Sequence, residues 1–183
     1  VVALPTDAER RYASIPIDRF VKVPHGVNSN YFNPEANKKK IDFQIKPDLI
    51  IGSVMKNHGR KNWAIVGFVA SALNVWGIKT ALLPLTTSIS GSQNWWDILN
   101  IFQGNSDFFP VVYGYMNSLM VIRPNTSVEL GYGFDEKDQA EVMKLMDIHI
   151  LPTRGEGFSL ATLESIALGI PNIVSDNEVL REV

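Results

Sequence analysis

Short apolar runs alternate with amphipathic stretches along this chain, and the alternation predicts strands connected by helices. The predicted strands are rich in Val, Ile and Leu and cover residues 1–4, 20–23, 49–54, 79–85, 119–123, 148–151 and 170–174. The predicted helices cover residues 7–14, 62–74, 94–102, 135–147 and 159–169. No hairpin signal separates consecutive strands, so the expected fold class is α/β, a Rossmann-like parallel sheet with helices on both faces.

The last predicted helix carries a glutamate among apolar residues. At 100° per residue, one face of this helix combines Glu164 with Leu160, Leu163, Ala167 and Leu168. A buried carboxylate is costly unless another group donates hydrogen bonds to it. That group is either a neighbouring part of the protein or a ligand, and the helix alone does not decide between them.

A second carboxylate, Glu156, precedes the same helix in a loop between Gly155 and Gly157. The loop follows one predicted strand and the helix leads into another, which makes a βαβ unit. Ligands collect where the ends of parallel strands meet helix N-termini. This setting favours a ligand site that includes both Glu156 and Glu164.

A cationic loop ahead of the helix at 62–74 is the second candidate site. It joins a strand end to a helix start and contains Lys56, His58, Arg60 and Lys61. Backbone amides and cations at a helix N-terminus suit a diphosphate. The chain has no P-loop, no complete dinucleotide fingerprint, and no DxD, HExxH or GxSxG motif, which argues against a metal site or a hydrolase nucleophile.

Composition excludes several other classes of protein. The 183 residues have a formal net charge of −2, so no overall charge attracts nucleic acid or acidic membranes. The chain has no cysteine, which excludes disulfides, thiolate catalysis and cysteine-ligated metals. The apolar run at 63–73 is too short to cross a bilayer and predicts a buried helix. The expected location is the cytoplasm.

Several of these motifs together resemble one protein family. Residues 156–160, Glu-Gly-Phe-Ser-Leu, with Glu164 and Gly169 are similar to the E-x7-E region of retaining glycosyltransferases of the GT-B fold, family 4 (glycosyl transferases group 1). Residues 23–28, Val-Pro-His-Gly-Val-Asn, resemble the interdomain segment of that family, and residues 60–62, Arg-Lys-Asn, resemble its sequence before the first helix. The resemblance covers about residues 21–183 of this chain. It is to the C-terminal, nucleotide-sugar-binding domain of that family.

The resemblance implies a donor site for a UDP-, GDP- or ADP-linked sugar. Glu164 would hold the ribose hydroxyls, and Glu156, the expected catalytic residue, would face the transferred sugar. The other expected donor-binding residues are Lys56, Arg60, Lys61, Arg123, Gly157, Phe158, Ser159 and Leu160. The lysines would neutralise the diphosphate leaving group, so neither a metal nor another cofactor is expected.

The resemblance also implies an incomplete enzyme. Residues 1–20 would be the tail of a preceding acceptor-binding domain, and residues 21–183 a donor domain truncated at its C-terminus. The acceptor-binding domain would be a missing partner, and any membrane association would come through that part. Two positions depart from the family: Ser53 follows Gly52 where an Arg is usual nearby, and Asn172 replaces an aliphatic residue.

The expected function is donor binding for a retaining, metal-independent hexosyltransferase, with the chain alone inactive. A GT-B sugar-nucleotide epimerase and a non-catalytic nucleotide-sugar-binding module are the alternatives. An epimerase would release product without an acceptor, so product analysis separates the two enzymes. The sugar, the nucleotide base and the acceptor are not identified by the sequence.

Overall fold

The computed structural model describes residues 1–40, 46–56, 58–86, 111–115, 118–123, 126–132 and 135–183, with only the backbone course of the strands between 111 and 132. The strands are β1 (Val2–Leu4), β2 (Phe20–Lys22), β3 (Leu49–Val54), β4 (Thr80–Leu85), β5 (Val111–Tyr115), β6 (Ser118–Arg123), β7 (Thr126–Tyr132), β8 (Ile148–Leu151) and β9 (Asn172–Val174). The helices are α1 (Asp7–Tyr12), α2 (Trp63–Val75), α4 (Glu136–Met143) and α5 (Leu160–Ala167), with 3-10 turns η1 (Ile17–Arg19) and η2 (Gly59–Lys61). The helix predicted at 94–102 lies outside the described residues.

Seven strands form the main sheet, in the order β7-β6-β5-β4-β3-β8-β9. Neighbouring strands in the part β5-β4-β3-β8-β9 pair in parallel, as predicted. The expectation that no hairpins occur was wrong, because β5, β6 and β7 form an antiparallel meander. Arg123 of β6 pairs with Thr126 of β7, so a very short connection joins them. Pro124 and Asn125 are residue types that favour turns, and the apolar pattern alone overlooked them.

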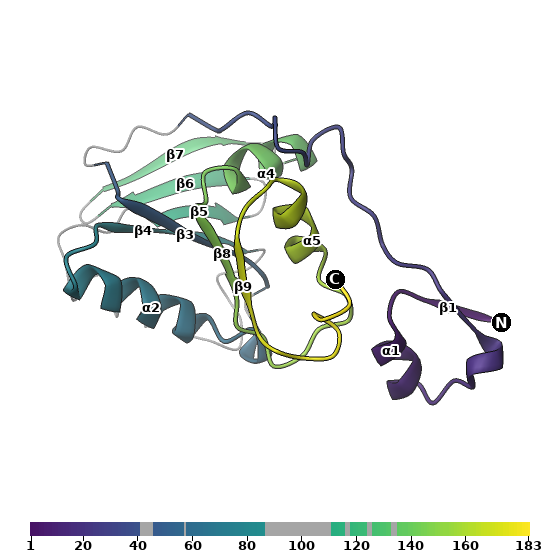
Figure 1. The fold of residues 1–183 in the computed structure, drawn as a ribbon. Helices are drawn as coiled ribbons and strands as arrows, with labels where there is room; N and C mark the ends of the chain where they lie inside the picture. The colour runs from purple at the N-terminus through teal and green to yellow at the C-terminus, as the bar shows by residue number, and fades with distance from the viewer. Residues whose placement is uncertain (41–45, 57, 87–110, 116–117, 124–125, 133–134) are drawn as a thin grey trace.

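Helices cover both faces of this sheet, which confirms the predicted fold class. Figure 1 shows α2 on one side of the sheet and α4 and α5 on the other. Trp63, Val66 and Ala70 of α2 pack in the first core cluster, together with buried residues of β3, β4 and β8. Met143 of α4 and Leu168 after α5 belong to the second core cluster on the opposite face.

Helix α2 is buried on one side only. The prediction of a buried helix therefore holds for one side, whereas Ile65 and Phe68 are 44% and 70% exposed. Residues three or four positions apart share a helix face, which is why Val66 and Ala70 are buried while Phe68 is not. None of the helices in the described ranges is long and apolar enough to cross a membrane.

The first 22 residues form a small unit that docks on the C-terminal end of the chain. Strands β1 and β2 pair in parallel, and α1 connects them (Figure 1). The Glu182 carboxylate accepts hydrogen bonds from the amides of Asp7 and Ala8, at 3.1 and 3.2 Å. Lys22 donates a third bond to Glu182, at 2.6 Å, and lowers the pKa of this carboxyl. Three bonds to one side chain thus hold α1 against the C-terminal segment.

Strand β3 explains one departure from the family pattern. Ser53 is fully buried, and its hydroxyl donates to the carbonyl of Ile150 at 2.6 Å, linking β3 to β8. Gly52 packs directly against Met146, whose side chain occupies the space that a Cβ would need. Both residues therefore serve the packing of the sheet against its neighbours.

Candidate functional site

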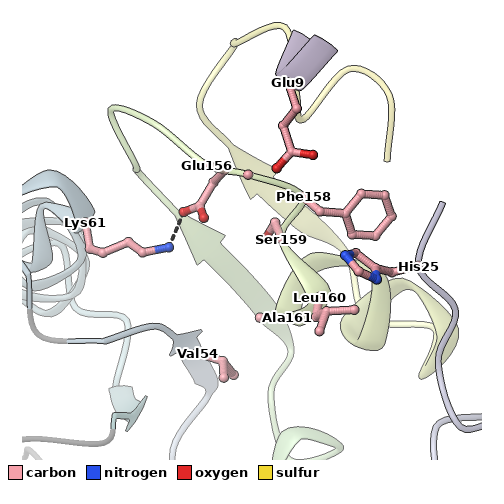
Figure 2. A pocket seen from close by; sticks show the side chains of 10 residues that line it. Glu9, His25, Val54, Lys61, Glu156, Phe158, Ser159, Leu160 and Ala161 are labelled. Carbon is pink, nitrogen blue, oxygen red and sulfur yellow. Dashed lines mark hydrogen bonds and ion pairs between the residues drawn. The ribbon is translucent and has the colours of Figure 1, made fainter. Parts of the chain in front are cut away.

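A cavity of about 380 Å³ opens between the ends of β3 and β8, the N-terminus of α5 and the N-terminal unit. Its walls come from parts of the chain that are far apart in the sequence (Figure 2). The lining residues are Glu9, His25, Val54, Lys61, Glu156, Gly157, Phe158, Ser159, Leu160 and Ala161. The cavity lies where parallel strands and a helix start meet, which is the usual place for ligands in α/β folds.

Lys61 and Glu156 form an ion pair on one wall of the cavity (Figure 2). Their side chains are only 11% and 6% exposed, so each charge depends on the other for compensation. The pair joins η2 to the loop after β8. The carbonyl of Arg60 accepts a hydrogen bond from the Arg154 amide at 2.8 Å, which holds the same two segments together. The two candidate regions predicted from the sequence therefore form one site.

The start of α5 forms the next part of the wall. Five consecutive residues, 157–161, line the cavity there. The N-cap residue Ser159 has a φ of 73°, in the left-handed region that costs energy for a residue other than glycine. Its carbonyl accepts bonds from the amides of Thr162 and Leu163, at 3.1 and 3.3 Å. First-turn amides ahead of these have no carbonyl within the helix to bond, so they are suited to an anion.

Glu164 is half-buried on α5 and has a protein partner. Its Oε2 atom accepts a hydrogen bond from Gln139 of α4 at 2.8 Å. Burial raises the pKa of the Glu164 carboxyl, Glu136 raises it further, and the Gln139 bond opposes the change. Glu164 does not line the cavity described above. A structural partner is thus observed, and the ribose contact stays a prediction.

The predicted apolar face of α5 differs from the face that the structure buries. Leu160 is 46% exposed, whereas Thr162 and Ser165 are 3% and 0% exposed. Small hydroxyl residues allow close approach to the sheet, and the Ser165 hydroxyl lies 2.8 Å from the Thr162 carbonyl, so its polar atom is compensated. The prediction holds for Leu168, which is fully buried, and was wrong for Leu160, because it scored side chains by apolarity and did not anticipate compensated hydroxyls.

Apart from Glu164, the predicted site residues fall into three groups. Those that line the cavity are Lys61, Glu156, Gly157, Phe158, Ser159 and Leu160. Lys56 and Arg60 are exposed and lie outside the lining; Lys56 precedes η2 and Arg60 lies within it. The side chain of Arg123, at the end of β6, lies outside the described residues.

Sequence reasoning missed two polar residues of the cavity. His25 belongs to the interdomain motif, but the motif did not indicate a role for it. Its ring contacts the Phe158 ring edge-on, with the ring centroids 4.9 Å apart. Glu9 projects from α1 and gave no local signal, because only the docking of the N-terminal unit brings it here (Figure 2). In the part of the chain that the structure describes, no group of three His, Cys, Asp or Glu residues could hold a metal ion.

Comparison with known proteins finds similarity over one segment of the chain. Residues 118–183 match the family model described as glycosyl transferases group 1. A stretch of 68 residues, 37% of this chain, is 35% identical to the O-antigen biosynthesis glycosyltransferase WclY of Escherichia coli and covers 19% of that protein. The chain therefore spans about a fifth of this curated relative.

Solved structures show the same fold over nearly the whole chain. The sucrose-phosphate synthase of Thermosynechococcus elongatus is similar over 96% of this chain and 40% of its own, with a TM-score of 0.62 and 18% identity. The catalytic domain of starch synthase IV from Arabidopsis thaliana, bound to ADP and acarbose, is similar over 96% of this chain and 36% of its own, with a TM-score of 0.58 and 13% identity. The chain has the Rossmann-like fold of these glycosyltransferase structures, and its residues 118–183 are similar to the group 1 glycosyl transferases.

Proposed function

We propose that this chain binds the nucleoside-diphosphate sugar of a glycosyltransferase that moves the sugar to a separate acceptor. The observation that carries the proposal is the Lys61–Glu156 pair on the wall of a cavity that also contains the N-terminus of α5. The family of residues 118–183 supports it, and so does the ADP bound in the similar starch synthase.

Charge compensation gives the proposed site its chemistry. When the bond between sugar and diphosphate breaks, negative charge develops on the leaving oxygen. Lys61 and the first-turn amides of α5 lie on the same cavity and would stabilise that charge without a metal ion. Glu156 holds Lys61 in place and would accept hydrogen bonds from the transferred sugar. We propose transfer with retention of the anomeric configuration.

Residues outside the cavity have supporting roles in this proposal. Lys56 and Arg60 are exposed on either side of His58 and would attract the anionic donor to the mouth of the site. Glu164 would bind the ribose hydroxyls with the oxygen that Gln139 does not occupy. Each of these roles follows from family resemblance and position.

Calorimetry with UDP-glucose, UDP-N-acetylglucosamine, GDP-mannose and ADP-glucose tests the proposal. We expect one nucleotide class to bind, and Glu164→Ala to weaken its binding. Glu178→Ala, which changes an exposed carboxylate that is paired with Arg11 and does not line the cavity, is the matched control. A folded protein that binds none of the four compounds would contradict the proposed function, and an unchanged affinity in Glu164→Ala would contradict the ribose assignment.

A further inference from the structure

We propose that Glu9 binds hydroxyl groups of the donor sugar, so that the N-terminal unit takes part in sugar recognition. This inference rests on the proposed function and adds a residue to it. Glu9 lies on α1. Apart from His25, which lies in the long connection after β2, the remaining cavity residues follow that connection in the sequence.

The Glu9 carboxylate lies in the cavity wall, and none of the described residues satisfies one of its oxygens. Its Oε2 atom is buried and has no hydrogen-bond partner among the residues that the structure describes. Figure 2 shows the carboxylate pointing toward the loop between Glu156 and Phe158. A buried carboxylate oxygen without a donor is costly, so a ligand that donates to it gains binding free energy.

The local sequence favours a different position for this side chain. Thr6 and Glu9 have the spacing of a capping box, in which the glutamate turns back to the amide of the N-cap residue. Half of the box forms, since Thr6 Oγ1 accepts from the Glu9 amide at 3.1 Å. The next two amides, of Asp7 and Ala8, bond instead to Glu182. The tertiary contact thus caps the helix, and the Glu9 side chain extends into the cavity.

Gly157 provides the space that the Glu9 carboxylate occupies. A Cβ at position 157 would lie 2.9 Å from Glu9 Oε1, closer than real Cβ contacts. The nearest atom is the end of a flexible side chain, so an alanine here would displace the Glu9 carboxylate and leave the backbone in place. The glycine of the E-x7-E region therefore permits this carboxylate to reach the cavity.

The charge of the cavity indicates which part of the donor Glu9 meets. Lys61 and Glu156 neutralise each other, and Glu9 then leaves the lining with a net negative charge. A diphosphate would be repelled near Glu9, whereas sugar hydroxyls donate hydrogen bonds to a carboxylate. The geometry and the charge both assign the Glu9 side of the cavity to the sugar, and the Lys61 side to the diphosphate.

Paired titrations of nucleotides and nucleotide sugars test this assignment. We would measure binding of UDP, GDP and ADP beside UDP-glucose, UDP-N-acetylglucosamine, GDP-mannose and ADP-glucose, using the 183-residue chain. Glu9→Gln is expected to weaken the nucleotide sugar about tenfold, the loss of one charged hydrogen bond, and to leave the free nucleotide unchanged. Asp7→Asn, on the same helix but outside the cavity, is the control that should change neither.

Gly157→Ala provides a second variant, because it should displace the Glu9 carboxylate and reproduce the selective loss. Thermal unfolding of each variant shows whether the fold is kept. If the wild-type chain binds a nucleotide sugar and Glu9→Gln binds it equally well, Glu9 is not a sugar ligand, although the proposed function stands. Equal loss of free nucleotide and nucleotide sugar would also overturn the assignment. Binding of no compound by the wild type would overturn both proposals.

Discussion

His149 Nδ1 lies 2.7 Å from Asn172 Oδ1, and the two residues are register partners on the neighbouring strands β8 and β9. The other ring nitrogen, Nε2, accepts a hydrogen bond from the Val54 amide at 3.3 Å. An imidazole that accepts at Nε2 and donates at Nδ1 is neutral. Asn172 is thus the partner of a fully buried histidine, which explains why an aliphatic residue is absent from this position.

The stability of the protein should depend on pH through His149. Burial lowers the pKa of this residue to about 4, from 6.5, and the Asn172 bond only partly opposes that effect. Between these values the unfolded state binds more protons than the folded state, so the free energy of unfolding decreases as the pH falls. The expected loss is about 3 kcal/mol over the whole window. Urea denaturation between pH 7.5 and 4.5 measures it.

His149→Gln should reduce this pH dependence, because the amide does not titrate. His58→Gln, at an exposed position, is the control and should keep the wild-type dependence. Glu164 acts in the opposite direction, since its raised pKa stabilises the fold at low pH and that contribution is lost as the pH rises. A wild-type slope in His149→Gln would show that another group is responsible.

Replacing Asn172 by Val should destabilise the protein by about 1–3 kcal/mol, because the buried His149 N–H loses its acceptor. The Ser165 hydroxyl, 2.5 Å from Asn172 Oδ1, loses a partner as well. The double variant His149→Val/Asn172→Val removes both polar groups and should be more stable than Asn172→Val alone at neutral pH. Chemical denaturation compares them, and an equally low stability of the double variant would contradict this account.

Much of the parallel core could be predicted because its elements have clear local signals. Strands β3 and β8 are apolar runs bounded by polar or turn residues, and their predicted bounds agree with the structure. Gly169, predicted as the C-terminal cap of α5, has a φ of 74°. The resemblance placed Lys61 and Glu156 in one site, and the strands that precede them, β3 and β8, prove to be neighbours in the sheet.

The rest depends on contacts between distant parts of the chain. The meander β5-β6-β7 carries weak turn signals, and strand direction is set by connections that periodicity does not report. The role of Asn172 requires the register of β8 and β9, and Glu9 enters the cavity only because Glu182 binds the start of α1. Local composition offers no signal for either arrangement.

Gly52→Ala should destabilise the fold by about 1–3 kcal/mol through overpacking. The added methyl group would overlap Met146, whose Sδ atom lies 2.1 Å from the Cβ position, and Met146 is only 4% exposed. Truncating the neighbour in Gly52→Ala/Met146→Ala should remove the overlap, so the two substitutions should cost less together than the sum of their separate effects. Thermal and urea unfolding give these values.

Gly26→Ala is the matched control for this series, because a Cβ at position 26 would meet no atom within 4 Å. It should leave the stability nearly unchanged. Additive costs at positions 52 and 146 would show that the close contact is not the cause of the destabilisation.

A pair of variants distinguishes the structural role of the Lys61–Glu156 ion pair from the role of Lys61 in ligand binding. Lys61→Met alone leaves the Glu156 carboxylate buried without its partner and should cost about 3 kcal/mol of stability. Lys61→Met/Glu156→Gln removes both charges and should recover most of that loss. Nucleoside-diphosphate binding should stay weak in both variants, because neither has the cation that the diphosphate needs.

Denaturation and calorimetry on the same samples check this separation. Lys137→Met, an exposed lysine on α4, controls for the loss of one positive charge and should change neither stability nor binding. If the double variant regains nucleotide affinity together with stability, then the contribution of Lys61 is only to hold the loop after β8. If affinity stays low while stability returns, Lys61 itself contacts the diphosphate, since the scaffold around the cavity is then intact.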